Sequence, residues 1–424
     1  MLTKTAMTAI ETTDSKTAKF IARRNRLIDA AATLINQHGL KGMTFANVAE
    51  LVDMNQNSLA YYFKRKEMLA HAAYMETLGR IADKVAEAAT RPDPRARLNH
   101  YLHLVFAAQR GMRTGEERPM TVLTGMSSLP EPYRAEATEL YQSVLRGMRD
   151  WFGPATQPED LAVNTARAHV VLEGVLWLPV WLRFYAIEDF DRVERRMFEV
   201  WERGVAPAGS ALVHMSFARA TPPEPRQEVD IDAFLRAATR LINRDGYRGA
   251  SVDRIAAELR VTKGSFYHHL EGKDDLVLAC FQRSYETIAR ALSDAGAAGG
   301  TMWDRLSRAL TALIEVQFSG DAPLMRTTAL ATLPATHRGE VISQSNIFAL
   351  RFAGVIIDGI SEGSIRPVDP LIASQMAMAM LNRAVDLQEW ATRVGPARAT
   401  AIYAEIFAHG MLPGAQSPAG ADAA

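Results

Sequence analysis

The chain of 424 residues has few of the features that mark secreted, redox-active or membrane-spanning proteins. Its one cysteine, Cys280, excludes an intrachain disulfide framework and a cysteine-rich metal site. Because Cys280 lies in the apolar stretch LVLACF, we expect a buried small side chain. No signal-like apolar region follows Met1, and no run of about 18 uncharged apolar residues occurs. The sequence therefore predicts a cytoplasmic protein without a membrane span.

Motifs of catalysis are also missing. We find no glycine-rich phosphate loop, no nucleophile elbow and no triad of metal-ligating residues. The sequence thus predicts no catalytic residues, no cofactor and no metal, and an enzyme is not expected.

An excess of charge of one sign is lacking too, because 48 basic and 48 acidic side chains give a formal net charge of +0. The distribution is nevertheless uneven. Residues 1–66 hold ten Lys and Arg against five Asp and Glu, and residues 226–273 hold nine against seven. The remainder is acidic on balance, so contact with nucleic acid is expected only at the basic segments.

The strongest positive signal is an internal repeat. Residues 28–72 align with residues 235–279 without a gap, and 12 of the 45 pairs are identical, among them Asn36 and Asn243. A repeat distance of 207 residues is too long for a solenoid unit, so one whole domain is used twice.

Each copy has the pattern of a helix-turn-helix. The first helix is predicted to end at a glycine, Gly39 in the first copy, which can adopt a positive φ. Thr44 or Ser251 then stands where the N-cap of a short helix belongs, and a turn leads to a second short helix over about 56–62 or 263–269. The second helix of such a unit fits the major groove of DNA.

With these motifs, both copies resemble the N-terminal DNA-binding domain of TetR/AcrR-family transcriptional regulators. The second copy, VTKGSFYHHLEGKDDL, is the closer match, and the first departs at Gln56, Asn57 and Ala60. No alternating strand pattern occurs. We therefore expect an all-α fold with two TetR-like halves, each a three-helix helix-turn-helix domain followed by a helical ligand-binding and dimerisation domain.

The resemblance implies which side chains contact double-stranded DNA. Amide side chains pair with adenine and lysine with guanine, while tyrosine hydroxyls and the lysine at the next helix start bind phosphates. Tyr267 and Lys273 match positions that the family uses on the DNA backbone. Packing in the three-helix core is the alternative for the aromatic side chains, above all for Tyr62. The predicted DNA-binding residues are Thr44, Gln56, Asn57, Tyr61, Tyr62 and Lys66 in the first copy and Ser251, Thr262, Lys263, Gly264, Tyr267, His268 and Lys273 in the second.

Composition divides the chain further. Residues 1–17 are expected to be a disordered arm, residues 413–424 a disordered tail, and the Pro-, Ala- and Gly-rich residues 205–228 a linker. The predicted domains are two DNA-binding domains, 18–65 and 229–272, and two helical regulatory domains, 66–204 and 273–412.

A small-molecule effector is a further expected partner, since helical domains of this family bind such ligands. In the apolar stretch 159–187, His169, Glu173 and Trp177 share one helix face, and a charge in so apolar a run needs a partner, a ligand or solvent. These residues line either a ligand pocket or the interface between subunits. His103 is a further pocket candidate, with a surface or core position as the alternative.

TetR-like regulators normally bind DNA as homodimers, but this chain carries two copies of the DNA-binding domain. A linker of about 25 residues can span about 75 Å when extended. We therefore expect an intramolecular pseudo-dimer whose halves meet through residues 159–203 and 368–410. A homodimer with four DNA-binding domains and a sensor with one degenerate helix-turn-helix are the alternatives. The predicted function is that of a ligand-responsive transcriptional repressor.

Overall fold

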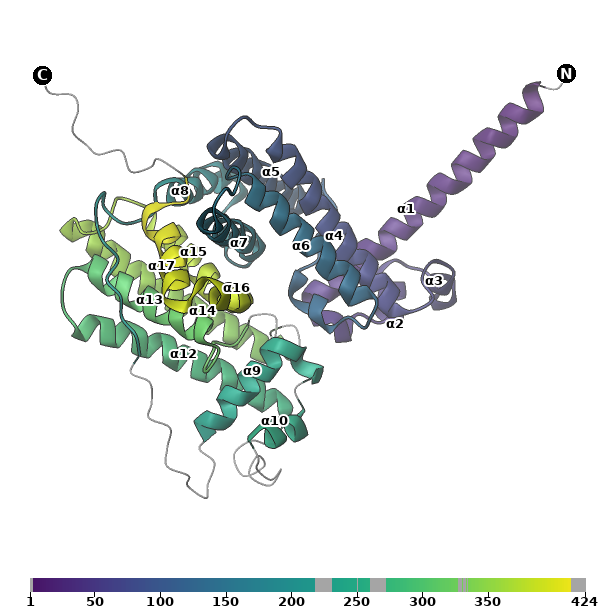
Figure 1. Ribbon diagram of the computed structural model, residues 1–424. Coiled ribbons are helices and arrows are strands. Elements are labelled where there is room, and N and C mark those ends of the chain that lie inside the picture. The colour runs from purple at the N-terminus through teal and green to yellow at the C-terminus, as the bar shows by residue number, and fades with distance from the viewer. Residues whose placement is uncertain are drawn as a thin grey trace, which may run out of the picture.

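Every regular element in the described part of the chain is a helix (Figure 1). The computed structural model describes residues 3–217, 231–249, 251–259, 272–326, 330, 333 and 335–412, and only the backbone at 3–17, 124, 245–249, 335 and 336. The predicted all-α fold is confirmed.

The helices fall into two halves of similar plan. The first half contains α1 (Thr3–Gly42), α2 (Phe45–Leu51), α3 (Gln56–Tyr62), α4 (Lys66–Ala89), α5 (Pro94–Thr114), η1 (Leu123–Ser128), α6 (Tyr133–Asp150), α7 (Pro158–Leu182), η2 (Ile187–Asp189) and α8 (Phe190–Arg203). The second half contains α9 (Ile231–Gly249), α10 (Val252–Leu259), α12 (Lys273–Ala297), α13 (Met302–Ser319), α14 (Ala335–Glu362), α15 (Pro370–Arg383), η4 (Ala384–Leu387), α16 (Gln388–Val394) and α17 (Pro396–His409).

Helix α1 is longer than the sequence suggested. It begins at Thr3, so the expectation of a disordered arm does not hold for residues 3–17. This stretch contains no glycine or proline, and nothing in it interrupts the helical register. In Figure 1 the N-terminal part of α1 projects away from the body. At the other end, Gly39 has φ 69° and ψ 177°, a conformation that glycine adopts without strain, and the chain turns there as predicted.

Both helix-turn-helix units use the same cap on their first short helix. Thr44 Oγ1 accepts a hydrogen bond from Asn47 N at 3.2 Å, and Ser251 Oγ accepts one from Arg254 N at 3.2 Å. Each hydroxyl satisfies a backbone donor that the first helical turn leaves unpaired. The predicted N-cap positions are confirmed in both copies.

Four helices form most of the contact between the two halves. α7 and α8 contact α15 and α17 (Figure 1). One continuous hydrophobic core contains residues of both halves. The backbones also meet at the ends of α8 and α17, where Val205 N donates to Phe407 O at 3.1 Å and Met411 N donates to Trp201 O at 2.9 Å.

The first part of the expected linker is extended and lies along α13. Trp303 Nε1 donates to Ala211 O at 2.9 Å, and Val213 N donates to Ser307 Oγ at 2.7 Å. The rest of the linker from residue 218 and the expected tail, 413–424, lie outside the described residues.

Helix α14 combines a buried and an exposed apolar face. Its residues His337–Glu362 are long and apolar enough to cross a membrane by length and composition alone. Ile356 is buried in the core of the second half, whereas Ile347, Leu350 and Ile357 are 46%, 59% and 49% exposed. We call these three residues the α14 stripe.

Candidate functional site

The recognition helix of the first copy, α3, is anchored on one face and open on the other. Leu59 is fully buried, whereas Gln56 and Asn57 are exposed and Tyr61 is 76% exposed. Asn55 caps the helix, because its Oδ1 accepts a hydrogen bond from Asn57 N at 2.9 Å. The open face offers two amides and a phenol, which can contact base edges and phosphates.

Tyr62 belongs to an aromatic cluster at the end of α3. Its ring stacks on Phe20 of α1 with centroids 4.9 Å apart, and Tyr61 lies edge-on to it at 5.3 Å. The cluster thus holds the end of α3 against α1. The ring of Tyr62 therefore packs against the protein, which was the alternative to DNA contact. Most of Tyr61 remains exposed and accessible to DNA.

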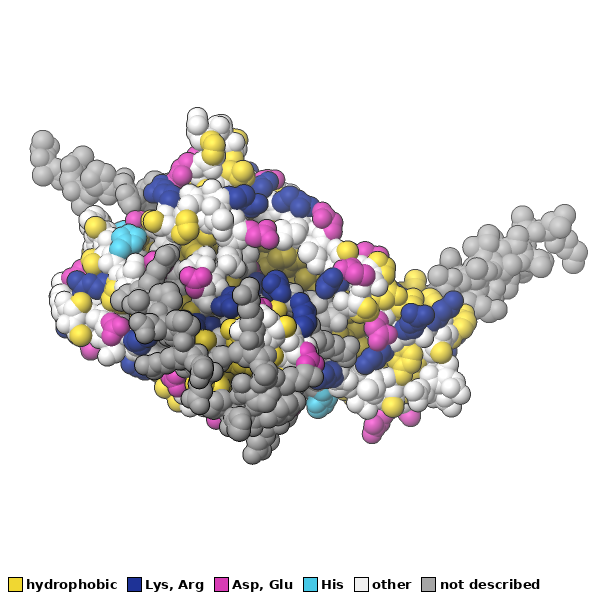
Figure 2. Space-filling model, turned by 60° about the horizontal axis from the view of Figure 1, so that its bottom comes forward, with side chains coloured by type: hydrophobic (Ala, Val, Ile, Leu, Met, Phe, Trp, Pro, Cys, Tyr) yellow, Lys and Arg dark blue, Asp and Glu magenta, His cyan; other side chains and the backbone are white. Residues whose placement is uncertain are grey.

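Basic side chains gather near the C-terminal end of α3. Lys64 and Arg65 are exposed and Lys66, at the start of α4, is half-buried. The guanidinium of Arg24 on α1 lies 5.4 Å from the centre of the Phe63 ring. Figure 2 shows Lys and Arg side chains beside hydrophobic ones on this lobe of the molecule. This surface has the charge that phosphate contact requires.

The second copy can be followed only in part. Thr262, Lys263, Gly264, Tyr267 and His268 lie outside the described residues. Lys273 starts α12, and burial, followed by the nearby charge of Lys41 in the first half, lowers its pKa. The start of α12 therefore brings positive charge close to that of Lys41 in the first DNA-binding domain.

The identical asparagines of the repeat do the same structural work in each half. Asn36 Nδ2 donates to Met120 O at 2.8 Å, and its Oδ1 accepts from Val122 N at 2.7 Å. Asn243 Nδ2 donates to Leu324 O at 2.9 Å, and its Oδ1 accepts from Arg326 N at 2.9 Å. Each amide thus ties the first helix of a DNA-binding domain to the regulatory domain behind it.

Removal of the Asn243 amide should destabilise the protein more than removal of the Asn36 amide. Asn243 is 7% exposed, so Asn243→Ala is expected to leave buried backbone groups unpaired and to destabilise the protein by about 1–3 kcal/mol. Asn36 is exposed, and water can replace its amide, so Asn36→Ala is expected to cost about 0.5–1.5 kcal/mol. Urea unfolding of the two variants checks the order, and equal losses would contradict it.

A network of buried charges lies where the halves meet. Glu173 on α7 is 2% exposed, and Arg383 Nε at the end of α15 lies 2.8 Å from its carboxylate. Arg383 also pairs with Asp386 at 2.8 Å, and Arg326 pairs with Asp386 from the other side. Burial, followed by the charge of Glu173, raises the pKa of Tyr141, whose hydroxyl donates to Glu173 at 2.6 Å. The sequence did not indicate a partner for the Glu173 carboxylate, and the structure shows that Arg383 of the other half pairs with it.

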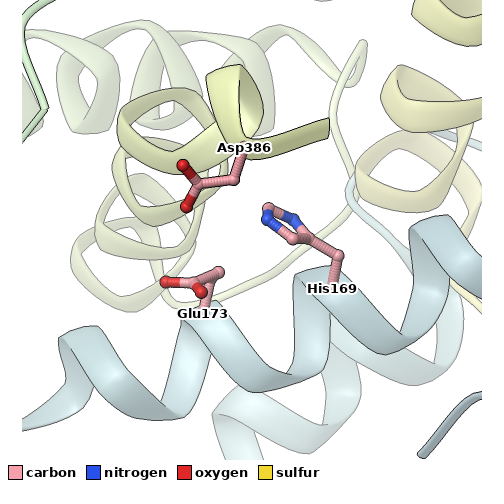
Figure 3. Close-up of side chains that lie close together, drawn as sticks. All are labelled: His169, Glu173 and Asp386. Atoms are coloured by element: carbon pink, nitrogen blue, oxygen red, sulfur yellow. The ribbon is translucent and has the colours of Figure 1, made fainter. Parts of the chain in front are cut away.

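Three of the residues in this region are close enough to bind a cation together. His169 and Glu173 rise from α7 toward Asp386 on η4, and potential ligand atoms of the three lie within 4.8 Å of one another (Figure 3). Arg383 and Arg326 already neutralise both carboxylates, however. A metal ion would have to displace a guanidinium, so the arrangement favours an ion-pair network.

Cavities adjoin this network on both sides. A cavity of about 450 Å³, here called the interface cavity, is lined by His169, Arg383 and other residues of both halves. A smaller one of about 190 Å³, lined by Glu173 and Trp177, also lies between the halves. A third, of about 700 Å³, lies within the first half between α1, α5 and α7, and we call it the first-half cavity. The predicted face of α7 thus serves both the interface and two cavities.

His103 takes the surface position that was named as the alternative to a pocket. Its side chain is 65% exposed on α5 and lies 3.4 Å from Glu194. The neighbouring Leu102 and Phe106 take the buried positions of the helix, which turns His103 outward. It lines none of the three cavities.

Comparison with known proteins agrees with this architecture. A family model described as bacterial regulatory proteins, tetR family, matches residues 27–73 and 234–280, which hold the two helix-turn-helix units. A second model, the tetracyclin repressor-like C-terminal domain, matches residues 299–411.

Individual relatives match shorter parts of the chain. The Transposon Tn10 TetC protein of Escherichia coli is 37% identical over 51 residues, which are 12% of this chain and 26% of that protein. The HTH-type transcriptional regulator BetI of Rhizobium meliloti (strain 1021) is 27% identical over 154 residues, 34% of this chain and 72% of that protein. The crystal structure of apo AibR aligns with a TM-score of 0.36 and 22% identity, over 42% of this chain and 96% of that one.

Two helix-turn-helix units, each followed by a helical body, define a DNA-binding transcriptional regulator. The chain belongs to the TetR family of bacterial regulatory proteins, with duplicated halves in one polypeptide. BetI and its fellow relative YhgD of Bacillus subtilis are named transcriptional regulators.

Proposed function

We propose that this regulator is a ligand-responsive repressor and that one chain binds one operator as an intramolecular pseudo-dimer. The observation that carries the proposal is the packing of α7 and α8 on α15 and α17. Surfaces that would otherwise join two chains are here joined within one, and the covalent connection raises their effective concentration to about the mM range. Because the two recognition helices differ in sequence, an asymmetric operator is expected.

The regulatory part of the proposal is supported by connections between the cavities and the DNA-binding domains. η1 contributes Leu123 and Met126 to the interface cavity and packs against both α1 and α9. Arg326 lines the same cavity and donates to Asn243 O on α9 at 2.6 Å. A ligand that moves these groups changes the placement of both DNA-binding domains. Linkage then requires ligand and DNA to weaken each other's binding by the same factor.

Light scattering on a genomically selected DNA site tests the assembly. Without DNA, we expect the mass of one chain, 46.7 kDa. In the complex, we expect one chain per DNA site. Gln56→Ala is expected to weaken binding by about 1–3 kcal/mol because it removes an amide from the open face of α3. Lys263→Ala should weaken binding as well.

A matched control is Gln282→Ala, which removes an exposed amide from α12. It should leave DNA affinity unchanged. Two chains per site, or indifference to Gln56→Ala, would rule out the pseudo-dimer with two working DNA-binding domains.

The α14 stripe favours a second candidate, a homodimer that carries four DNA-binding domains. Ile347, Leu350 and Ile357 form an exposed apolar surface on one helix. If this surface joins two chains, the mass in solution is twice 46.7 kDa, and Leu350→Asp returns it to that of one chain. A wild-type chain that is monomeric at all concentrations would dismiss this candidate.

A further inference from the structure

The interface cavity is built from both halves of the chain. Tyr141 and His169 of the first half face Arg383 and Trp390 of the second across a volume of about 450 Å³. Such a volume lies in the range of sites for small organic ligands. The cavity has no symmetric counterpart among the cavities described above.

Arginines are the most numerous charged side chains of the lining, and Arg146 and Arg149 pair with Glu139 and Asp150 outside it. Five arginines stand against two carboxylates, those of Asp386 and Glu389. The two inner arginines, Arg326 and Arg383, pair with Asp386 and Glu173. At the rim, Arg393 is exposed, and no ion pair or hydrogen bond of its side chain occurs within the described residues. The rim therefore offers a guanidinium to an anion from solvent.

The inner end of the cavity contains polar atoms without partners. His169 is 1% exposed and Trp390 is 6% exposed, yet His169 Nε2 and Trp390 Nε1 have no hydrogen-bond partner in the described part of the chain. Tyr403 donates to Met380 O at 3.3 Å, so its oxygen is left to accept from His169 Nδ1 at 3.1 Å. A neutral His169 then presents Nε2 as an acceptor, and burial lowers the pKa of His169 toward that neutral form.

We propose that the interface cavity binds one amphipathic organic anion per chain. Its acidic group pairs with Arg393, its apolar body packs against Leu145 and Leu387, and a hydrogen-bond donor at its other end reaches His169 Nε2. Trp390 Nε1 donates to an acceptor on the same molecule. The inference names the class of effector and so rests on the proposed regulation, but the binding itself needs no DNA.

The probe for this site is 8-anilinonaphthalene-1-sulfonate, which combines an anionic group, two aromatic systems and one N–H donor. Fluorescence titration of the full chain without DNA is expected to give one saturable site. Arg393→Glu should raise its dissociation constant by about tenfold or more, because it removes a charge-assisted hydrogen bond. This residue is exposed, so the folded structure should persist. Leu145→Trp should abolish binding because the indole fills the cavity.

Met112→Trp is the matched control, since it places the same bulk in the first-half cavity. It should leave the titration unchanged. Unaltered binding in Arg393→Glu and Leu145→Trp would overturn the inference, as would loss of binding in Met112→Trp alone. Two chains per operator would instead contradict the proposed function, and the result of the fluorescence titration would still stand.

Discussion

Replacing Arg383 by methionine is expected to destabilise the protein by about 3–5 kcal/mol. Methionine keeps most of the volume but leaves Glu173, 2% exposed, without its cation. Burial alone would lower the pKa of Arg383, but the carboxylates of Asp386 and Glu173 raise it, so the guanidinium is charged at every accessible pH. Because Glu173 and Arg383 belong to different halves, the loss should also loosen the halves from each other. Chemical unfolding followed by tryptophan fluorescence measures it.

Two controls separate buried charge from charge in general. Arg398 pairs with Glu159 across the same interface, but their side chains are 59% and 49% exposed. Arg398→Met is therefore expected to cost at most about 1 kcal/mol. The double variant Glu173→Met/Arg383→Met should be more stable than Arg383→Met alone, because it removes the orphaned carboxylate. Equal losses in Arg383→Met and Arg398→Met would refute the explanation.

Substitution of Gly204 by alanine should produce the second large effect. Gly204 ends α8 with φ +66°, and a Cβ there would lie 2.1 Å from Ala408 O in the other half. At Gly410, the corresponding end of α17, an added Cβ would lie 2.3 Å from Glu202 O. We expect a loss of about 1–2 kcal/mol from the positive φ and of about 1–3 kcal/mol from the forced separation of the two backbones.

The control for Gly204→Ala is Gly209→Ala. Gly209 has φ +77°, but an added Cβ would have no atom within 4 Å. Its substitution is expected to cost only the conformational part, about 1–2 kcal/mol. If both variants lose the same stability in urea unfolding, the close approach of the halves at Gly204 does not matter energetically.

Local features of this protein were predictable from the sequence because they depend on neighbouring residues. The turn at Gly39 and the caps at Thr44 and Ser251 follow from preferences of single residue types. Cys280 is fully buried, and burial raises its pKa to about 11, as its apolar surroundings suggested. The gapless repeat by itself indicates that the domain is duplicated.

Partners across long sequence separations were not predictable. Glu173 clearly required a partner, but nothing local pointed to Arg383, which lies 210 residues further along the chain. Nothing local indicated that Tyr403 lies beside His169, or that His103 points outward toward Glu194. The polar composition of residues 3–17 suggested disorder, but the structure has a helix there. The helix is consistent with the absence of glycine and proline from this stretch.

The sequence by itself determined the helical class, the two copies of the helix-turn-helix and the residues on the open face of α3, since periodicity, capping and repeat are written in adjacent positions. Only the tertiary structure decided how α7 meets α15 and α17, which arginine neutralises which carboxylate, and that a cavity remains between the halves. The physical reason is that burial and ion pairing depend on distances in space, and residues far apart in the chain acquire those distances only when the two helical bodies pack together.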